Sequence, residues 1–180
     1  MSKVKKLFEE SILTKVQIIE SEEFIIIEEM AESISKAIVK GKKVMLCGNG
    51  GSAADAQHLA AEMLIRLRPK NNRESLPAIS LAQDTSTITA CGNDFGFDKL
   101  FERTLNGLGN QGDILLAITT SGNSVNIINA INAARKKDIK VFGFLGSGGG
   151  KTSSLCDKVF MVPGDNTGRI QEAHITAGHA

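Results

Sequence analysis

The chain has 180 residues, of which 42% are hydrophobic and 23% charged, and this is typical of a packed globular protein with one domain. Its net charge is +1 and it lacks tryptophan and tyrosine, so the basic stripe and stacking aromatics of a nucleic-acid-binding surface are missing. No apolar run approaches the roughly 20 residues that span a bilayer, and the N-terminus lacks the apolar core of a signal peptide. The three cysteines are far apart and form no C-x-x-C pair. We therefore expect a cytoplasmic protein with reduced thiols and with neither a membrane nor a nucleic-acid partner.

The first 40 residues carry two amphipathic patterns. Apolar side chains recur at intervals of three and four residues, which predicts two consecutive helices. The apolar positions are Val4, Leu7, Phe8, Ile12, Val16 and Ile19 in the first helix, and Phe24, Ile27, Met30, Ala31, Ile34 and Ile38 in the second. We expect Ser21 to cap the start of the second helix and Gly41 to follow its end.

From residue 41 onward, short apolar runs alternate with helical patterns. Polar residues at 68–76 and 163–168 predict exposed loops. The predicted strands are 44–47, 77–81, 113–118, 140–145 and 158–162, and the predicted helices are 52–66, 125–137 and 169–180. Continuous apolar strands separated by helices indicate a parallel sheet that is covered on both faces. Ligands of such folds bind beyond the carboxyl ends of the strands, where the glycine and serine clusters of this chain fall.

A cluster of hydroxyl side chains follows the third predicted strand and opens a helix. Its members are Thr119, Thr120, Ser121 and Ser124, arranged around Gly122. Backbone N–H groups and the dipole at a helix N-terminus favour an anion, and hydroxyls add donors without adding charge. One serine would suffice as a helix cap, so a cap alone does not account for the cluster. The pattern favours a phosphate site.

Two glycine loops resemble nucleotide motifs but depart from them. Gly48, Gly50 and Ala53 match G-x-G-x-x-A, yet the region about 20 residues on is basic, where a dinucleotide site needs an acid. We therefore reject NAD binding. Residues 145–152 resemble a P-loop that is one residue short, with Leu145 in the place of the first glycine. A shortened loop cannot cradle phosphates in the same way, so a glycine turn after a strand is the favoured interpretation.

Histidine and carboxylate residues gather on two predicted helices. His58 and Glu62 lie four residues apart, on one face of the helix that starts at the first glycine loop. Such a pair is more often a surface hydrogen bond than a catalytic or metal site. The last helix carries Gln171, His174 and His179, and we expect His174 to be an exposed helix residue.

The spacing of Gln171 and His179 raises a geometric question. Eight helical residues separate them by roughly 12 Å along the axis and about 80° around it, so the two side chains cannot stand side by side. Either both lean towards one point or a second subunit provides one of them. The second alternative would make the site an interface feature.

Taken together, these motifs resemble those of the phosphoheptose isomerases, a family of the sugar isomerase (SIS) domain superfamily. The resemblance rests on residues 48–52, 92–96, 120–124 and 169–172, with His179 eight residues after Gln171. It covers nearly the whole chain, and the motifs occur in order. It implies a single SIS domain over residues 1–180, in which residues 41–180 form a three-layer α/β/α sandwich with a flavodoxin-like, five-stranded parallel sheet. The two helices of residues 1–40 would serve oligomer packing, in a homotetramer with active sites between subunits.

The resemblance also implies an activity and a set of site residues. The reaction would convert D-sedoheptulose 7-phosphate to D-glycero-D-manno-heptose 7-phosphate, the first step towards the heptose of bacterial surface glycans. Glu62 and His179 match the family's proposed base and acid. The residues that match the family's sugar site are Asn49, Gly50, Gly51, Ser52, Asn93 and Asp94, and those that match its phosphate site are Thr119, Thr120, Ser121 and Ser124. The ligands of one zinc ion per subunit would be His58, Glu62, Gln171 and His179.

The chain departs from the family at Gly168, where an acidic residue is often found, and it ends at Ala180, earlier than the family's last helix usually does. Other functions remain open at this point. Some SIS-domain proteins sense sugar phosphates or bind a replication initiator without catalysis, and other isomerases act on hexose or pentose phosphates. Because this chain keeps the acid, the base and the metal residues together, the isomerase interpretation is favoured over a non-catalytic relative.

Overall fold

The computed structural model describes residues 2–82, 84–146 and 148–180. Within them, helices alternate with strands from the first strand onward, as the apolar pattern predicts. The elements are α1 (Lys3–Glu20), α2 (Phe24–Val39), β1 (Val44–Gly48), α3 (Gly51–Leu64), β2 (Ala78–Ser80), α4 (Thr85–Asp94), η1 (Phe97–Lys99), α5 (Leu100–Leu108), β3 (Ile114–Thr119), α6 (Val125–Lys136), β4 (Lys140–Gly146), η2 (Ser153–Leu155), β5 (Lys158–Val162) and α7 (Thr167–His179).

The five strands form one parallel sheet in the order β2-β1-β3-β4-β5. Gly48 at the end of β1 lies opposite Ile118 of β3, and Thr119 lies opposite Leu145 of β4. The first glycine loop, the hydroxyl loop and the loop after β4 therefore leave the same edge of the sheet. This strand order and direction confirm the predicted flavodoxin-like sheet.

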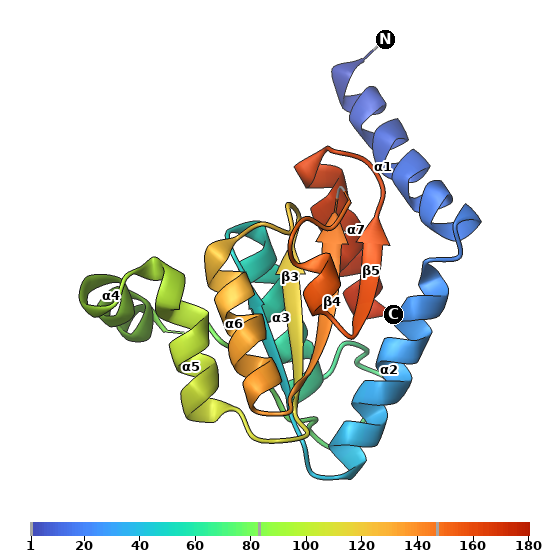
Figure 1. The fold of residues 1–180 in the computed structure, drawn as a ribbon. Helices are drawn as coiled ribbons and strands as arrows, with labels where there is room; N and C mark the ends of the chain where they lie inside the picture. Colours follow the sequence, from blue (N-terminus) through green and yellow to red (C-terminus); the bar gives the residue numbers. More distant parts are fainter. Residues whose placement is uncertain (1, 83, 147) are drawn as a thin grey trace.

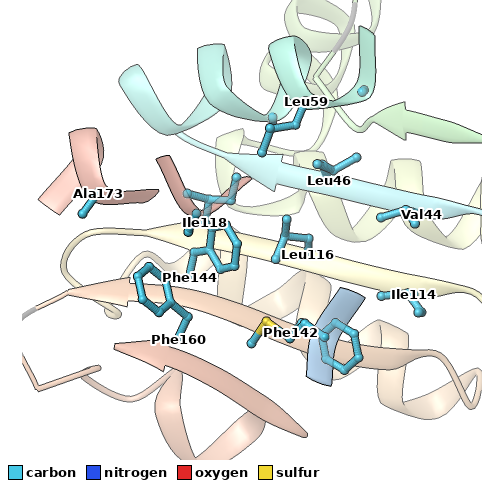
Figure 2. Packing of buried hydrophobic residues seen from close by; sticks show 14 of the residues in the cluster. Val44, Leu46, Leu59, Ile114, Leu116, Ile118, Phe142, Phe144, Phe160 and Ala173 are labelled. Carbon is cyan, nitrogen blue, oxygen red and sulfur yellow. The ribbon is translucent and has the colours of Figure 1, made fainter. Parts of the chain in front are cut away.

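Helices cover both faces of the sheet, which gives the predicted three-layer sandwich (Figure 1). Side chains alternate along each strand, so Val44 and Leu46 of β1 face one core while Met45 and Cys47 face the other. The first core lies under α2, α3 and α7, and Figure 2 shows its buried phenylalanines, Phe142, Phe144 and Phe160. The second core lies under α5 and α6.

Several element boundaries differ from the predicted ones. Helices α4 and α5 were not predicted. Ser21 ends α1 instead of capping α2, whose first residue follows Glu23 and has no side-chain cap. Helix α7 begins two residues earlier than expected, because the Asn166 side chain accepts hydrogen bonds from the backbone N–H groups of Gly168 and Arg169. Gly41 follows the end of α2 with φ at +73°, as predicted.

The two N-terminal helices pack differently. Helix α2 covers the sheet, with Met30 buried in the first core. Helix α1 extends away from the body (Figure 1) and buries only Thr14 and Ile18. The side chains that gave α1 its apolar pattern are each 40% to 67% exposed: Val4, Leu7, Phe8, Ile12, Val16 and Ile19. Among residues 2–82, 84–146 and 148–180, no helix has the length and apolar character needed to span a bilayer.

His174 is buried, so the prediction of an exposed helix residue was wrong. Its side chain has no solvent exposure and packs in the first core, with ring centroids 5.8 Å from Phe144 and 6.3 Å from Phe160. Burial lowers the pKa of His174 from its ordinary value of 6.5 to about 4, because the charged imidazolium is poorly solvated there. The side chain is therefore neutral at physiological pH.

We predict that His174 makes the protein less stable as the pH falls from about 7 to about 4. Below pH 6.5 the unfolded chain takes up a proton that the folded chain cannot bind until about pH 4, so acid favours unfolding. The shift corresponds to up to about 3 kcal/mol of unfolding free energy at pH 4. Urea unfolding at several pH values, on wild type and His174→Leu, measures it. If both proteins lose stability in parallel over this range, the buried imidazole is not the cause.

Candidate functional site

The loop between β1 and α3 depends on two glycines. A Cβ on Gly48 would lie 2.4 Å from the carbonyl oxygen of Ser52, so no larger residue fits without moving the loop. Gly50 precedes α3 with φ at +56°, a conformation that residues with a side chain rarely adopt. The backbone of residues 48–52 therefore turns sharply from strand to helix. This turn places the N-terminus of α3 at the sheet edge.

In the loop between β3 and α6, two hydroxyl groups accept hydrogen bonds from the loop's own backbone. Thr119 Oγ1 accepts a hydrogen bond from the backbone N–H of Gly122, and Ser121 Oγ accepts one from that of Asn123, so both hydroxyl protons remain available. Ser124 stands at the N-cap of α6 but makes no capping hydrogen bond. The hydroxyls thus face a helix N-terminus that they do not cap, which is the arrangement expected of an anion site.

The glycine turn after β4 supports the hydroxyl loop. A Cβ on Gly122 would lie 2.0 Å from the carbonyl oxygen of Gly149, so the two loops touch through their backbones. The fully buried Thr152 donates to the carbonyl oxygen of Gly122 twice, from Oγ1 at 2.7 Å and from its backbone N–H at 3.0 Å. The segment is a turn after a strand, as predicted, and it also fixes Gly122. Ser147 of this turn lies outside the described residues.

A pair of asparagines joins the two sugar-phosphate loops predicted from the sequence. Asn49 Nδ2 donates to Asn126 Oδ1 at 2.9 Å, and Asn126 Nδ2 donates to Asn49 Oδ1 at 2.8 Å. Asn126 is buried, and its Oδ1 also accepts from the backbone N–H of Ile127. The β1–α3 loop and the start of α6 are therefore held in one fixed arrangement.

Helices α3 and α7 run side by side, and Gly178 allows their close contact. A Cβ on Gly178 would lie 2.5 Å from the side chain of Leu59, and one on Gly51 would lie 3.5 Å from Gln171 Cγ. Gln171 therefore meets the start of α3, and His179 meets its later part. One chain accordingly brings both Gln171 and His179 against α3, but at different positions along it, so the two geometric alternatives both stay open.

The predicted acid, base and metal residues meet along this helix pair. His58 Nε2 and His179 Nε2 are 2.9 Å apart, and Glu62 Oε1 lies 3.5 Å from His58 Nε2. Two imidazole nitrogens at this distance share one proton or face one cation. Within residues 2–82, 84–146 and 148–180, no group of three or more His, Cys, Asp or Glu side chains is arranged so that it could hold a metal ion.

Gln171 lies on the same helix pair, close to the start of α3. Its Nε2 donates to Asp55 Oδ1 at 2.6 Å. Asp55 is buried, and burial raises the pKa of its carboxyl, while the hydrogen bond from Gln171 and the charges of His58 and His179 lower it. The helix pair thus carries a buried carboxylate that the sequence analysis did not single out.

Arg73 donates hydrogen bonds at the C-terminal end of α3, next to Glu62. Its guanidinium donates to the carbonyl oxygens of Glu62 at 2.8 Å, of Met63 at 2.9 Å and of Glu74 at 2.8 Å. Helix α3 has no basic residue in its own last turn, so Arg73 provides the positive charge that a helix C-terminus favours. A hollow of about 230 Å³ beside it is lined by Arg66, Arg68 and His179, which favours anionic ligands.

Two predicted sugar-site residues lie apart from this cluster. Asn93 and Asp94 are exposed at the end of α4, which projects from the side of the molecule opposite α2 (Figure 1). Asn93 Nδ2 donates to Asp94 Oδ1 at 2.7 Å, and neither side chain is hydrogen-bonded to the glycine loops or to α7. The chain by itself does not bring them to the other site residues.

Comparisons with known proteins identify the family. The SIS domain family matches residues 7–146. A phosphoheptose isomerase of a Nitratiruptor species is 52% identical over 144 residues, which cover 80% of this chain and 76% of that protein. The chain belongs to the phosphoheptose isomerase family. The solved phosphoheptose isomerase of Neisseria gonorrhoeae has a TM-score of 0.89 at 41% identity, covering 98% of this chain and 93% of the other. That of Francisella tularensis has a TM-score of 0.91 at 37% identity, covering 99% and 95%.

Three further residues of this phosphoheptose isomerase family member support the site without having been predicted. Asp55 lies on the same helix as His58, three residues before it, and this spacing is a signal that could have revealed it. Asn126 and Thr152 gave no such signal. Their partners, Asn49 and Gly122, are distant in sequence, and only the parallel arrangement of the strands brings them together.

We predict that Thr152→Val weakens phosphate binding to this family member by about fivefold. The variant keeps the side-chain shape and loses the hydroxyl that fixes Gly122, a hydrogen bond worth about 1 kcal/mol. Calorimetric titration with inorganic phosphate measures the dissociation constant. Thr152→Ser keeps the hydroxyl and is the matched control. Equal weakening in both variants would mean that the methyl group, not the hydrogen bond, supports the loop.

Proposed function

We propose that this member of the phosphoheptose isomerase family converts D-sedoheptulose 7-phosphate to D-glycero-D-manno-heptose 7-phosphate in the cytoplasm. The observation that carries the proposal is the meeting of Glu62, His58 and His179 on the α3–α7 pair, in a chain whose hydroxyl loop leaves the N-terminus of α6 without a side-chain cap. The reaction is the first step towards the heptose of bacterial surface glycans. The free thiols of the chain agree with a reducing compartment.

The substrate would bind with its phosphate at the start of α6. The hydroxyls of Thr119, Thr120, Ser121 and Ser124 would donate to the phosphate oxygens, together with the backbone at the helix N-terminus. The sugar would then extend over residues 49–52 towards Gln171 and His179. Asn49 keeps one amide proton and one oxygen lone pair for a sugar hydroxyl, because its bonds to Asn126 use only half of its capacity.

Proton transfer would proceed through an enediol. The Glu62 carboxylate takes a proton from C1 of the ketose and returns it to C2. Meanwhile His179 donates a proton to the oxygen on C2, and it regains a proton from the hydroxyl on C1 as the aldehyde forms. A half-buried carboxylate and an imidazole suit these roles near neutral pH. The net reaction moves two hydrogens between adjacent carbons and needs no external oxidant.

One zinc ion per subunit would be held by His58, Glu62, Gln171 and His179. The donor set of two imidazoles, a carboxylate and an amide oxygen suits this ion, and the two Nε2 atoms already face each other. When bound, zinc would supply a Lewis acid that polarises the substrate carbonyl. A carboxylate bound to zinc is a weaker base, so we infer that the ion is either loosely held or mainly shapes the pocket.

We further propose that the protein is a homotetramer with active sites between subunits. The exposed apolar side chains of α1 support this, because monomeric proteins rarely expose a contiguous apolar patch of this kind. The position of Asn93 and Asp94 supports it as well. Since their own chain leaves them apart from the helix pair, a neighbouring subunit can bring them to the sugar.

Turnover of sedoheptulose 7-phosphate by the purified protein tests the activity. We predict that Glu62→Gln and His179→Gln each lower kcat by at least about 100-fold, because general acid–base groups contribute about 100- to 10,000-fold. Glu32→Gln, at an exposed carboxylate paired with Lys36, is the matched control and should retain full activity. Circular dichroism confirms that each variant is folded.

Two outcomes would contradict the proposal in different ways. Active wild type with active Glu62→Gln would leave the isomerase assignment in place and remove Glu62 as the base. Inactive wild type, with and without added zinc, whose melting temperature rises with sugar phosphate would indicate a non-catalytic sensor or a partner-binding protein instead.

Removal of the metal tests the role of zinc separately. We predict that dialysis against a chelator lowers kcat by at least about tenfold and that added zinc restores it, because the sample loses both a Lewis acid and an ion that shapes the pocket. The matched control is the same protein dialysed without chelator. A metal-free sample with full activity would show that zinc does not act as a Lewis acid in this enzyme.

A further inference from the structure

We propose that Asp55 is a positioning residue that holds the Gln171 carboxamide with its oxygen turned towards the metal and sugar. The inference deepens the proposed function, since it depends on Gln171 being a ligand. Gln171 Nε2 donates to Asp55 Oδ1 at 2.6 Å, a short and charge-assisted hydrogen bond. The amide nitrogen is thereby committed to α3, and the amide oxygen is left for a ligand.

The chemistry of the pair fixes which way the amide points. An ionised carboxylate only accepts hydrogen bonds, so it attracts the NH₂ end of a carboxamide and repels its oxygen. Without such a partner the two ends of an amide have nearly the same shape, and either could face the ligand. A metal ion binds only the oxygen. Asp55 therefore selects the orientation of Gln171 that can coordinate zinc.

The environment of Asp55 indicates that this interaction has a specific role. Asp55 is 4% exposed, and its second carboxylate oxygen, Oδ2, is buried without a hydrogen-bond partner among the described residues. A half-satisfied buried carboxylate is costly for folding. No lysine or arginine pairs with it, and Gln171 is its only hydrogen-bond partner in the described chain. A residue needed only for packing would not carry this charge.

Gln171 packs against the start of α3. The Cβ position of Gly51 lies 3.5 Å from Gln171 Cγ, an ordinary van der Waals distance. Asp55 lies one turn further along α3, and His58 follows three residues later. Asp55 and the proposed ligand His58 thus share one face of α3, and that face meets α7, which carries Gln171 and His179.

The experiment measures zinc affinity by competition with a chromophoric chelator. We expect Asp55→Asn to weaken zinc binding by about tenfold. Metal affinity typically falls by about 10- to 100-fold when the hydrogen-bond partner of a metal ligand is changed. Asp138→Asn is the matched control. Asp138 also accepts a hydrogen bond from a glutamine, Gln111 Nε2 at 3.3 Å, but lies just before β4, at the opposite end of the sheet from the site. The Asp138→Asn variant should bind zinc with the same affinity as wild type.

A double variant distinguishes orientation from simple charge attraction. In Gln171→Glu, residue 171 presents an oxygen whichever way it turns, and it faces the like charge of Asp55. We therefore expect Asp55→Asn to strengthen zinc binding in the Gln171→Glu background, the reverse of its effect beside Gln171. If Asp55 only attracted the cation from a distance, Asp55→Asn would weaken binding in both backgrounds. That result would overturn the proposal.

The remaining outcomes also decide the question. Wild type that binds zinc and turns over substrate, with unchanged affinity in Asp55→Asn, would overturn the role of Asp55 and leave the proposed function in place. Wild type that binds no zinc would overturn the metal site and this proposal with it. If Asp55→Asn alone does not fold, the comparison uses Asp55→Asn/Gln171→Glu. In that protein the amide introduced at position 55 can donate to the carboxylate introduced at position 171, so we expect zinc affinity at least equal to that of wild type.

Discussion

Helices α3 and α7 can approach closely because Gly178 places no side chain against Leu59. The rest of the site depends on this contact. It aligns Gln171 with Asp55 at one end of the helix pair and His179 with His58 at the other. A side chain at Gly178 would collide with Leu59, push the helices apart and separate the imidazoles. The catalytic arrangement is thus set by helix packing more than by any single hydrogen bond.

A second constraint comes from the sheet. Parallel strands end at one edge, so loops that are far apart in sequence become neighbours there. The loops after β1, β3 and β4 meet in this way, and backbone contacts such as that between Gly122 and Gly149 leave little freedom. The hydroxyl loop is therefore held in shape before any ligand arrives, which lowers the entropic cost of binding a phosphate.

The sequence was sufficient to predict the sheet and most of its helices, because long apolar runs and glycine turns are local signals. It did not predict α4, a ten-residue helix whose only buried residue is Cys91. It also missed α5, although Leu100, Phe101 and Leu105 lie at helical spacing and are buried, so the signal was present in a segment of only nine residues. His174 was misjudged for a different reason. Its ring is accommodated between Phe144 and Phe160, and these residues belong to strands 14 or more positions away.

The residues of the candidate site likewise differ in whether the sequence alone could predict them. The motifs that resemble the family gave His58, Glu62, Gln171 and His179, and the structure brings the two histidines and Glu62 together. Asp55, Asn126 and Thr152 act through partners that are 30 to 116 positions distant, so their roles became visible only in three dimensions. The sequence also could not place Asn93 and Asp94, which their own chain leaves exposed at the end of α4.

The asparagine pair has a consequence for how this family can evolve. Each amide both donates to and accepts from the other, so replacing Asn49 or Asn126 alone with aspartate would set two acceptors against each other. Replacing either with an apolar residue would leave a buried amide unpaired, which is costly. Drift at one position is therefore blocked unless the other changes as well. Across the family, positions 49 and 126 should vary together or not at all.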